Sequence, residues 1–135
     1  MYEKLFSLKI PSGWAVIHNS FGDVEPIIQD GSIVNDEFFN EDLLSIEAIQ
    51  FDGSYWQVDK NGYTLDLGWY PEANPDGFYR LTLIRGSWDH IVAKCESKDR
   101  YQIHRLVERC LELITQGSED LEISRQIKFD QVTAA

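Results

Sequence analysis

Residues 62–86 constrain the fold more than any other part of the 135-residue chain. Apolar and polar side chains alternate in residues 63–69 and again in residues 79–84, which is the pattern of half-buried β-strands. Between these runs, residues 71–77 (PEANPDG) contain two prolines and a glycine, which favour a turn and interrupt strand pairing. We therefore predict an antiparallel hairpin at the centre of a sheet, with a positive φ angle at Gly77.

Strand-like runs also precede this hairpin. Residues 5–10 and 14–19 are predicted to pair as a first hairpin, because Pro11 and a Ser-Gly turn separate them. Residues 43–51 fit either a strand or a short helix. We favour the strand, because an Asp-Gly turn follows and leads into the β-prone residues 55–58, which should continue the meander into the central hairpin.

The segment between these strands, residues 20–40, holds no period and is expected to be rich in loops, with a short extended piece around residues 33–39. After the central hairpin, residues 88–96 are predicted to form another strand. Weak alternation in residues 121–129 predicts an edge strand near the end of the chain.

A helical period begins after Ser97. Apolar residues recur along one stripe, at Ile103, Leu106, Val107, Cys110 and Ile114. Ser97 is predicted to cap this helix and Gly117 to end it. The expected fold class is α+β: an antiparallel sheet of about five to six strands in meander order, with a C-terminal amphipathic helix on one face. We expect one domain over residues 1–130 and a frayed tail over residues 131–135.

The formal charge is −11 at pH 7, and the excess is concentrated in one block. Residues 20–79 contain thirteen acidic side chains and one basic side chain, Lys60. Solubility accounts for a high net charge but does not require that the charge be segregated. Because phosphate binding needs Lys and Arg, the charge argues against nucleic acid or an anionic membrane as the partner and favours a basic protein.

The sequence shows no signal for a membrane-spanning or exported chain. No apolar run approaches the roughly 20 residues that a membrane span needs. The first residues, MYEKLFSLKIPSG, carry charges where a signal peptide has its apolar stretch. We therefore expect a cytoplasmic protein.

No residue pattern matches a metal site. His90, Cys95, His104 and Cys110 are spaced too widely for the paired ligands of structural zinc sites. Both cysteines are expected to be buried thiols, whose pKa burial raises rather than lowers.

Catalytic patterns are equally weak. A glycosidase-like acid pair of Asp66 with Glu72 or Asp76 is conceivable, but 23 acidic residues produce such pairs by chance. Glycine-rich phosphate loops do not occur in the sequence. We predict a protein that is not an enzyme and that holds no metal or cofactor.

The remaining feature combines aromatic and acidic side chains. Such a combination is typical of a protein-binding surface, where aromatic anchors are buried at the centre and carboxylates attract a basic partner. A core tryptophan with a solvated acidic rim explains the same pattern without a partner. The predicted partner-binding residues are Asp23, Glu25, Asp36, Glu37, Glu41, Asp42, Trp69, Tyr70, Glu72 and Asp76.

In size, segregated acidity and the DLGWYPEANPDG loop followed by a strand and an amphipathic helix, the chain resembles the bacterial immunity proteins of polymorphic-toxin and contact-dependent inhibition systems. The resemblance implies tight inhibition of one cognate toxin, often a basic nuclease whose nucleic-acid groove the acids cover. The alternative is a small enzyme or ligand-binding domain whose pocket is lined by Trp56, Trp69, Tyr70 and Trp88.

Overall fold

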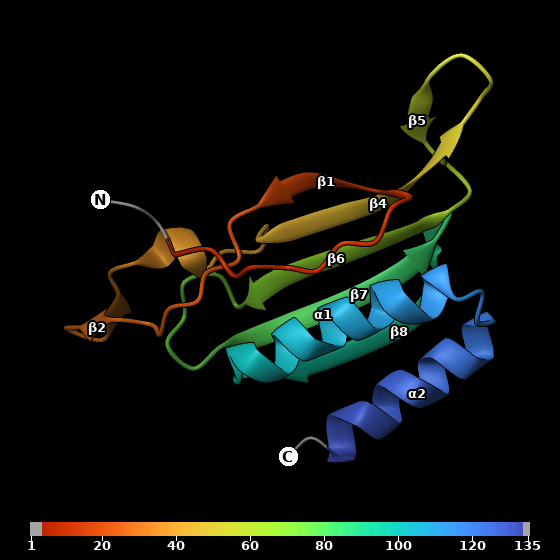
Figure 1. Ribbon diagram of the computed structural model, residues 1–135. Coiled ribbons are helices and arrows are strands. Elements are labelled where there is room, and N and C mark those ends of the chain that lie inside the picture. Colours follow the sequence, from red (N-terminus) through yellow and green to blue (C-terminus); the bar gives the residue numbers. More distant parts are fainter. Residues whose placement is uncertain (1–3, 134–135) are drawn as a thin grey trace.

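The protein consists of one antiparallel sheet covered on one face by two helices (Figure 1). The computed structural model describes residues 4–133. Neighbouring strands follow the order β1-β4-β6-β7-β8, and the short strand β5 pairs only with β4. The predicted α+β class, with about six antiparallel strands, is confirmed. The elements of this layered core are β1 (Trp14–Asn19), β4 (Leu44–Phe51), β5 (Trp56–Val58), β6 (Tyr63–Tyr70), β7 (Phe78–Arg85), β8 (Ser87–Ser97), α1 (Arg100–Thr115) and α2 (Asp120–Thr133).

The predicted central hairpin is formed by β6 and β7, which pair from Tyr63 with Arg85 to Tyr70 with Phe78. The prediction of a positive φ at Gly77 is wrong, because the left-handed residue of the loop is Ala73. Glycine is needed at position 77 for another reason: a Cβ there would lie within 2.5 Å of Trp69 Nε1.

The predicted hairpin of residues 5–10 and 14–19 does not form, because β1 pairs with β4 instead. Residues 5–10 are extended, and a single bridge from Leu5 to Gly22 is their only strand-like pairing among residues 4–133. This segment packs beside α1, where Ser7 O accepts a hydrogen bond from His104 Nε2 at 2.7 Å. Its alternating apolar residues therefore contact the helix layer.

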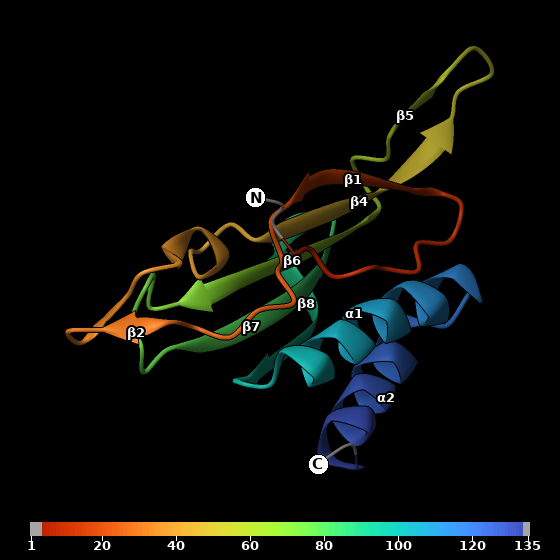
Figure 2. The ribbon, with the colours of Figure 1, turned by 60° about the vertical axis from the view of Figure 1, so that its left-hand side comes forward.

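The meander holds for β6, β7 and β8 but not for β5. The first half of β4 pairs with β6, from Leu44 with Leu67 to Glu47 with Thr64, and only its second half pairs with β5. The end of β4 and all of β5 therefore leave the sheet as a separate hairpin, which projects beyond the other strands (Figures 1 and 2).

The loop-rich segment contains a two-stranded ribbon of β2 (Ile28–Gln29) and β3 (Ser32–Ile33), followed by the 3-10 helix η1 (Asp36–Phe38). Of the extended piece predicted around residues 33–39, only Ile33 belongs to a strand, and residues 36–38 form a helical turn instead. Phe21 and Phe39 are fully buried and fix this segment to the core.

The predicted amphipathic helix is α1, and its apolar stripe is buried except for Ile114, which is partly buried. The cap was assigned wrongly, because the side chain of Asp99, not that of Ser97, accepts the hydrogen bond from Tyr101 N. Both cysteines are buried free thiols, as expected. Burial raises the pKa of the Cys95 thiol to about 12.

The predicted edge strand over residues 121–129 is wrong, because these residues belong to α2. Ile123 and Ile127, four residues apart, are buried, whereas Leu121 and Phe129, which alternation would place on the same face, are exposed. That spacing is helical. The helix also includes residues 131–133 of the predicted frayed tail, and residues 134–135 lie outside the described part.

Both helices and the N-terminal segment cover the same face of the sheet, as Figures 1 and 2 show. Leu65, Leu67 and Trp69 of β6 face them and belong to the core. In the part of the chain that the structure describes, no helix or strand covers the opposite face. We call it the open face; it carries Glu47 of β4 and Asp66 of β6.

Candidate functional site

The acidic block is largely free of internal cation partners. Of its thirteen carboxylates, only Asp23 and Glu25 form ion pairs within residues 4–133, both with Arg100. Arg80, a cation on the open face, pairs with Glu96 at 2.8 Å and lies over the ring of Tyr70. The other eleven carboxylates form no ion pair within residues 4–133.

Two loops that are distant in sequence bring several of these acids together at one end of the sheet. Ala73 N donates a hydrogen bond to Phe39 O at 2.7 Å, and Glu41 N donates one to Glu72 Oε1 at 3.3 Å. A shallow cavity of about 360 Å³ lies between the loops, lined by Asp36, Glu37, Asn40, Glu72 and Ala73. Figure 1 places η1 and the β6–β7 loop side by side at this end.

The acids continue from the loops onto the open face. Tyr70 Oη donates to Glu41 O at 3.3 Å. Burial, followed by the negative charges of Asp66 and Glu41, raises the pKa of this tyrosine. We call the whole set the acidic surface, and it comprises Asp36, Glu37, Glu41, Asp42, Asp66 and Glu72.

A glycine in β6 allows this arrangement. Trp69 N donates to Asn40 O, and Leu43 N donates to Leu67 O, so residues 40–43 lie directly against β6. A Cβ at Gly68 would overlap the carbonyl group of Glu41. Glycine at position 68 therefore lets the backbone that carries Glu41 and Asp42 lie close against β6.

Trp69 is a buried residue that contacts both loops of the acidic surface. It is 3% exposed, and its ring packs edge-on against Phe39 and Tyr79 at centroid distances of 5.0 Å. Its Nε1 donates to Asn74 O at 2.9 Å, which holds the β6–β7 loop. Trp69 is thus a core residue that positions the acids and does not itself reach the surface.

Asp66 has no charged residue opposite it on either neighbouring strand. It is half-buried on β6 between Ser45 of β4 and Thr82 of β7, neither of which carries a charge. Burial, with a smaller contribution from the negative charge of Asp42, raises the pKa of Asp66 to about 6. An ionised Asp66 is therefore costly in the isolated chain, and a cation placed over it would relieve that cost.

This raised pKa predicts a pH-dependent stability difference between the wild type and Asp66→Asn. In the folded state the Asp66 carboxyl keeps its proton up to about pH 6, whereas in the unfolded chain it loses the proton near the ordinary aspartate pKa of 3.8. As the pH rises from 4 to 6, the wild type therefore becomes less stable, whereas Asp66→Asn, which has no carboxyl there to titrate, does not show this loss. At pH 7 we expect the free energy of unfolding of Asp66→Asn to exceed that of the wild type by about 1 kcal/mol, after allowance for solvent screening.

Urea unfolding at pH 4, 5, 6 and 7 measures this difference. Asp36→Asn, which removes an exposed carboxylate, controls for the general effect of one fewer negative charge. A difference between Asp66→Asn and the wild type that stays constant from pH 4 to pH 7 would contradict the assignment.

The ten predicted site residues do not form one group. Asp36, Glu37, Glu41, Asp42 and Glu72 lie in the acidic surface, with Tyr70 beside them and Trp69 beneath. Asp76 is exposed on the same β6–β7 loop. Asp23 and Glu25 are set apart, because Arg100 at the start of α1 holds them.

Sequence reasoning omitted Asp66 from the predicted partner-binding residues. The alternation of β6 places it opposite the core residues Leu65 and Leu67, and that signal was present in the sequence. Its uncharged neighbours on β4 and β7, however, follow only from the strand register.

The pocket postulated from four aromatic residues does not appear. Trp69 is buried, while Trp56 and Trp88 are 61% and 58% exposed. None of these three, nor Tyr70, lines any of five cavities found among residues 4–133. The structure therefore provides no geometry for the aromatic-lined site.

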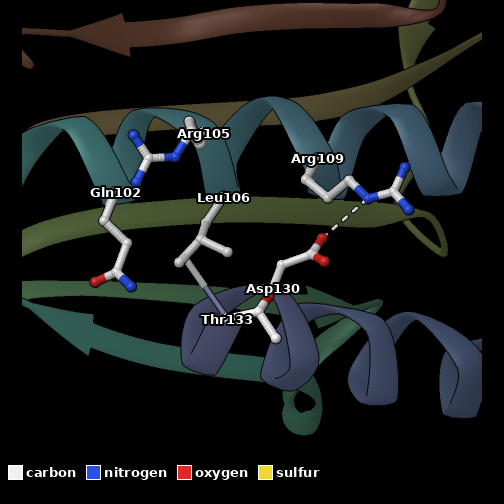
Figure 3. Close-up of a pocket in the computed structure, with 6 residues that line it drawn as sticks. All are labelled: Gln102, Arg105, Leu106, Arg109, Asp130 and Thr133. Atoms are coloured by element: carbon white, nitrogen blue, oxygen red, sulfur yellow. Dashed lines mark hydrogen bonds and ion pairs between the residues drawn. The ribbon is translucent and has the colours of Figure 1, made fainter. Parts of the chain in front are cut away.

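A cavity of about 280 Å³ lies between α1 and α2 (Figure 3). Its polar groups are largely used in holding the helices together. Arg109 Nε pairs with Asp130 Oδ2 at 3.0 Å, and Gln102 Nε2 donates to Gln131 O at 2.9 Å. This arrangement explains the contact between the helices without a ligand.

A polar cluster at the start of α2 has a similar role. Asp120 accepts hydrogen bonds from Tyr63 and Arg85, and His90 Nε2 lies 3.3 Å from its Oδ2. Burial and the hydrogen bond to Asp120 raise the pKa of Tyr63 to about 12, so this hydroxyl stays protonated at neutral pH. The cluster fastens α2 to the end of the sheet.

Comparison with known proteins gave no match: no family model, no curated protein and no solved structure is significantly similar to this chain. Neither helix of the described chain combines the length and the apolarity of a membrane span. Over residues 4–133, no three His, Cys, Asp or Glu side chains are grouped as they would be to hold a metal ion.

Proposed function

We propose that the chain is an inhibitor of the immunity-protein type, which binds a basic toxin and blocks it through the acidic surface. The main support is the acidic surface itself: two loops and the open face bring its carboxylates together, and none of these carboxylates forms an ion pair within residues 4–133. A toxin that acts on nucleic acid needs Lys and Arg side chains in its groove, and these are the groups such a surface attracts.

Asp66 provides the strongest local argument for a cationic partner. Its half-buried carboxylate has no cation among the ion pairs of residues 4–133. A lysine or arginine of the partner would supply the charge that the chain lacks there and would stabilise the ionised form. Binding should then release a proton near pH 6, where the free carboxyl is half-protonated.

The fixed loop geometry supports inhibition more than loose electrostatic attraction. Hydrogen bonds from Ala73 N, Trp69 N and Glu41 N hold the two acid-bearing loops together before any partner arrives. A preorganised surface loses little conformational entropy on binding, and this small entropy loss favours a tight complex.

The proposal requires that the gene immediately upstream of this chain's gene encode a large secreted protein with a C-terminal toxin domain, and the test is co-expression of that domain with the chain. We expect that domain alone to stop bacterial growth, and co-expression of the chain to restore growth. The two proteins should also elute as one stable complex in size-exclusion chromatography. An upstream gene of another kind, or growth arrest that the chain does not relieve, would refute the proposed function.

A further inference from the structure

The β4–β5 hairpin is built differently from the rest of the sheet. Beyond Ala48, β4 has lost its pairing with β1 and β6, and its residues 49–51 pair only with β5. At its base, Ile49 N donates a hydrogen bond to Gly13 O at 3.0 Å, and Asp59 N donates one to Ala48 O at 2.9 Å. The hairpin therefore projects from the body of the protein, at the end of the sheet away from η1 and the β6–β7 loop (Figures 1 and 2).

Three aromatic side chains lie exposed on this projection. Phe51, Tyr55 and Trp56 are 54%, 62% and 61% exposed. Phe51 and Trp56 face each other across the two strands, with ring centroids 5.5 Å apart. Aromatic groups of this size bind strongly when a partner buries them, and tryptophan and tyrosine are enriched among residues that dominate binding energy.

The turn at the tip of the hairpin is held by its own hydrogen bonds. Asp52 Oδ1 accepts hydrogen bonds from Ser54 N at 2.8 Å and Tyr55 N at 2.9 Å, and Asp52 N donates to Tyr55 O. Gly53 has the positive φ of 98° that this tight turn needs. Exposed aromatics on a preformed turn lose little entropy on binding.

We propose that Phe51, Tyr55 and Trp56 form a second contact element, which inserts into a cleft of the same basic protein that the acidic surface binds. This inference rests on the proposed function and names a further part of the interface. The aromatic side chains fill an apolar recess of the partner, and Asp52 and Asp59 beside them meet basic side chains at its rim.

Charge complementarity favours this occupant over a second copy of the chain. Asp52 and Asp59 have no ion-pair partner within residues 4–133, and Lys60 is the only base of the surrounding block. A second copy would bring the same excess of carboxylates and would be repelled.

The distance between the two contact elements suits a single partner. The eight residues of β4 span about 25 Å from the loop end to the hairpin. A typical interface of about 800 Å² per partner is roughly 30 Å across. Between the two ends the open face carries Glu47 and Asp66, so the acidic character continues along the whole path.

The experiment measures complex formation between the chain and the toxin domain encoded upstream, by surface plasmon resonance. In the double variant Phe51→Ser and Trp56→Ser, we expect the dissociation rate constant to rise at least about 30-fold, as when binding hot spots are removed. The salt dependence of association should stay as in the wild type, because no charge is changed. Phe129→Ser, which removes an equally exposed aromatic from α2, should alter dissociation less than threefold.

Each outcome separates this inference from the proposed function. If the wild type does not bind the toxin domain, the proposed function fails and the hairpin inference fails with it. If the wild type binds and the hairpin variant dissociates at the wild-type rate, only the hairpin inference is refuted. If the wild type forms dimers in size-exclusion chromatography that the hairpin variant loses, the aromatic side chains face a second copy, which also refutes it. Thermal unfolding should be nearly unchanged in the double variant, since both side chains lie outside the core.

Discussion

Neutralising three carboxylates of the acidic surface should weaken the complex with the toxin about 100-fold. The variant carries Glu41→Gln, Asp42→Asn and Glu72→Gln, which replace charge while keeping side-chain size. These residues lie where the two loops meet, and none of them pairs with a cation in residues 4–133. Each charge in contact with a basic partner contributes about 1 kcal/mol to binding, which multiplies to two orders of magnitude in the dissociation constant.

Titration calorimetry with the purified toxin domain measures this dissociation constant. The matched control carries Asp89→Asn, Glu119→Gln and Glu122→Gln, which also remove three acidic charges but lie on β8 and at the start of α2. We expect the control to weaken binding less than fivefold. Equal losses in the two variants would mean that net charge, and not the acidic surface, drives association.

Truncating Trp69 should destabilise the folded chain by about 3–5 kcal/mol, the usual cost of removing a buried tryptophan. The substitution Trp69→Ala removes the edge-on packing against Phe39 and Tyr79, together with the hydrogen bond to Asn74 O. Since domains of this size are stable by only about 5–15 kcal/mol, a large share of the stability is lost. Both acid-bearing loops should loosen as well, because Phe39 and Asn74 belong to them.

Urea unfolding at pH 7 gives the free energy of this change, and amide hydrogen exchange of residues 39–43 and 71–77 reports the loops. Trp88→Ala is the control, because Trp88 is 58% exposed on β8 and should cost less than about 1 kcal/mol. A loss below 1 kcal/mol in Trp69→Ala would contradict the core position of this side chain.

The sequence was most informative where one face of an element is buried against the core. The alternation around Leu65 and Leu67 and the stripe from Ile103 to Cys110 gave the central hairpin and α1 correctly. Both are long and have a single period, so the side chains that face the core are fixed by geometry.

The errors have a common cause. The spacing of apolar residues indicates that one face of a segment is buried, but it does not indicate which element covers that face. Residues 5–10 alternate as a strand does, yet their backbone lies beside α1, and the bridge from Leu5 to Gly22 is its one strand-like pairing within residues 4–133. In residues 121–129, Ile123 and Ile127 fit both a period of two and a spacing of four, and only the exposure of Leu121 and Phe129 separates the two.

The candidate site could be predicted only in part. The block of acids and the proline-bearing loop are visible in the sequence, but the contact between Phe39 and Ala73 joins residues 34 positions apart. The ion pairs of Asp23 and Glu25 with Arg100 depend in the same way on tertiary structure. Strand register, and not composition, decides which carboxylates remain uncompensated.

The salt dependence of the association rate constant tests the central claim most directly. Wild-type chain and toxin domain are mixed in a stopped-flow instrument at ionic strengths from 25 to 500 mM. If the uncompensated carboxylates attract a basic partner, the association rate constant should fall at least about tenfold over this range, because salt screens exposed charges. A rate constant that stays within a factor of two would contradict the account.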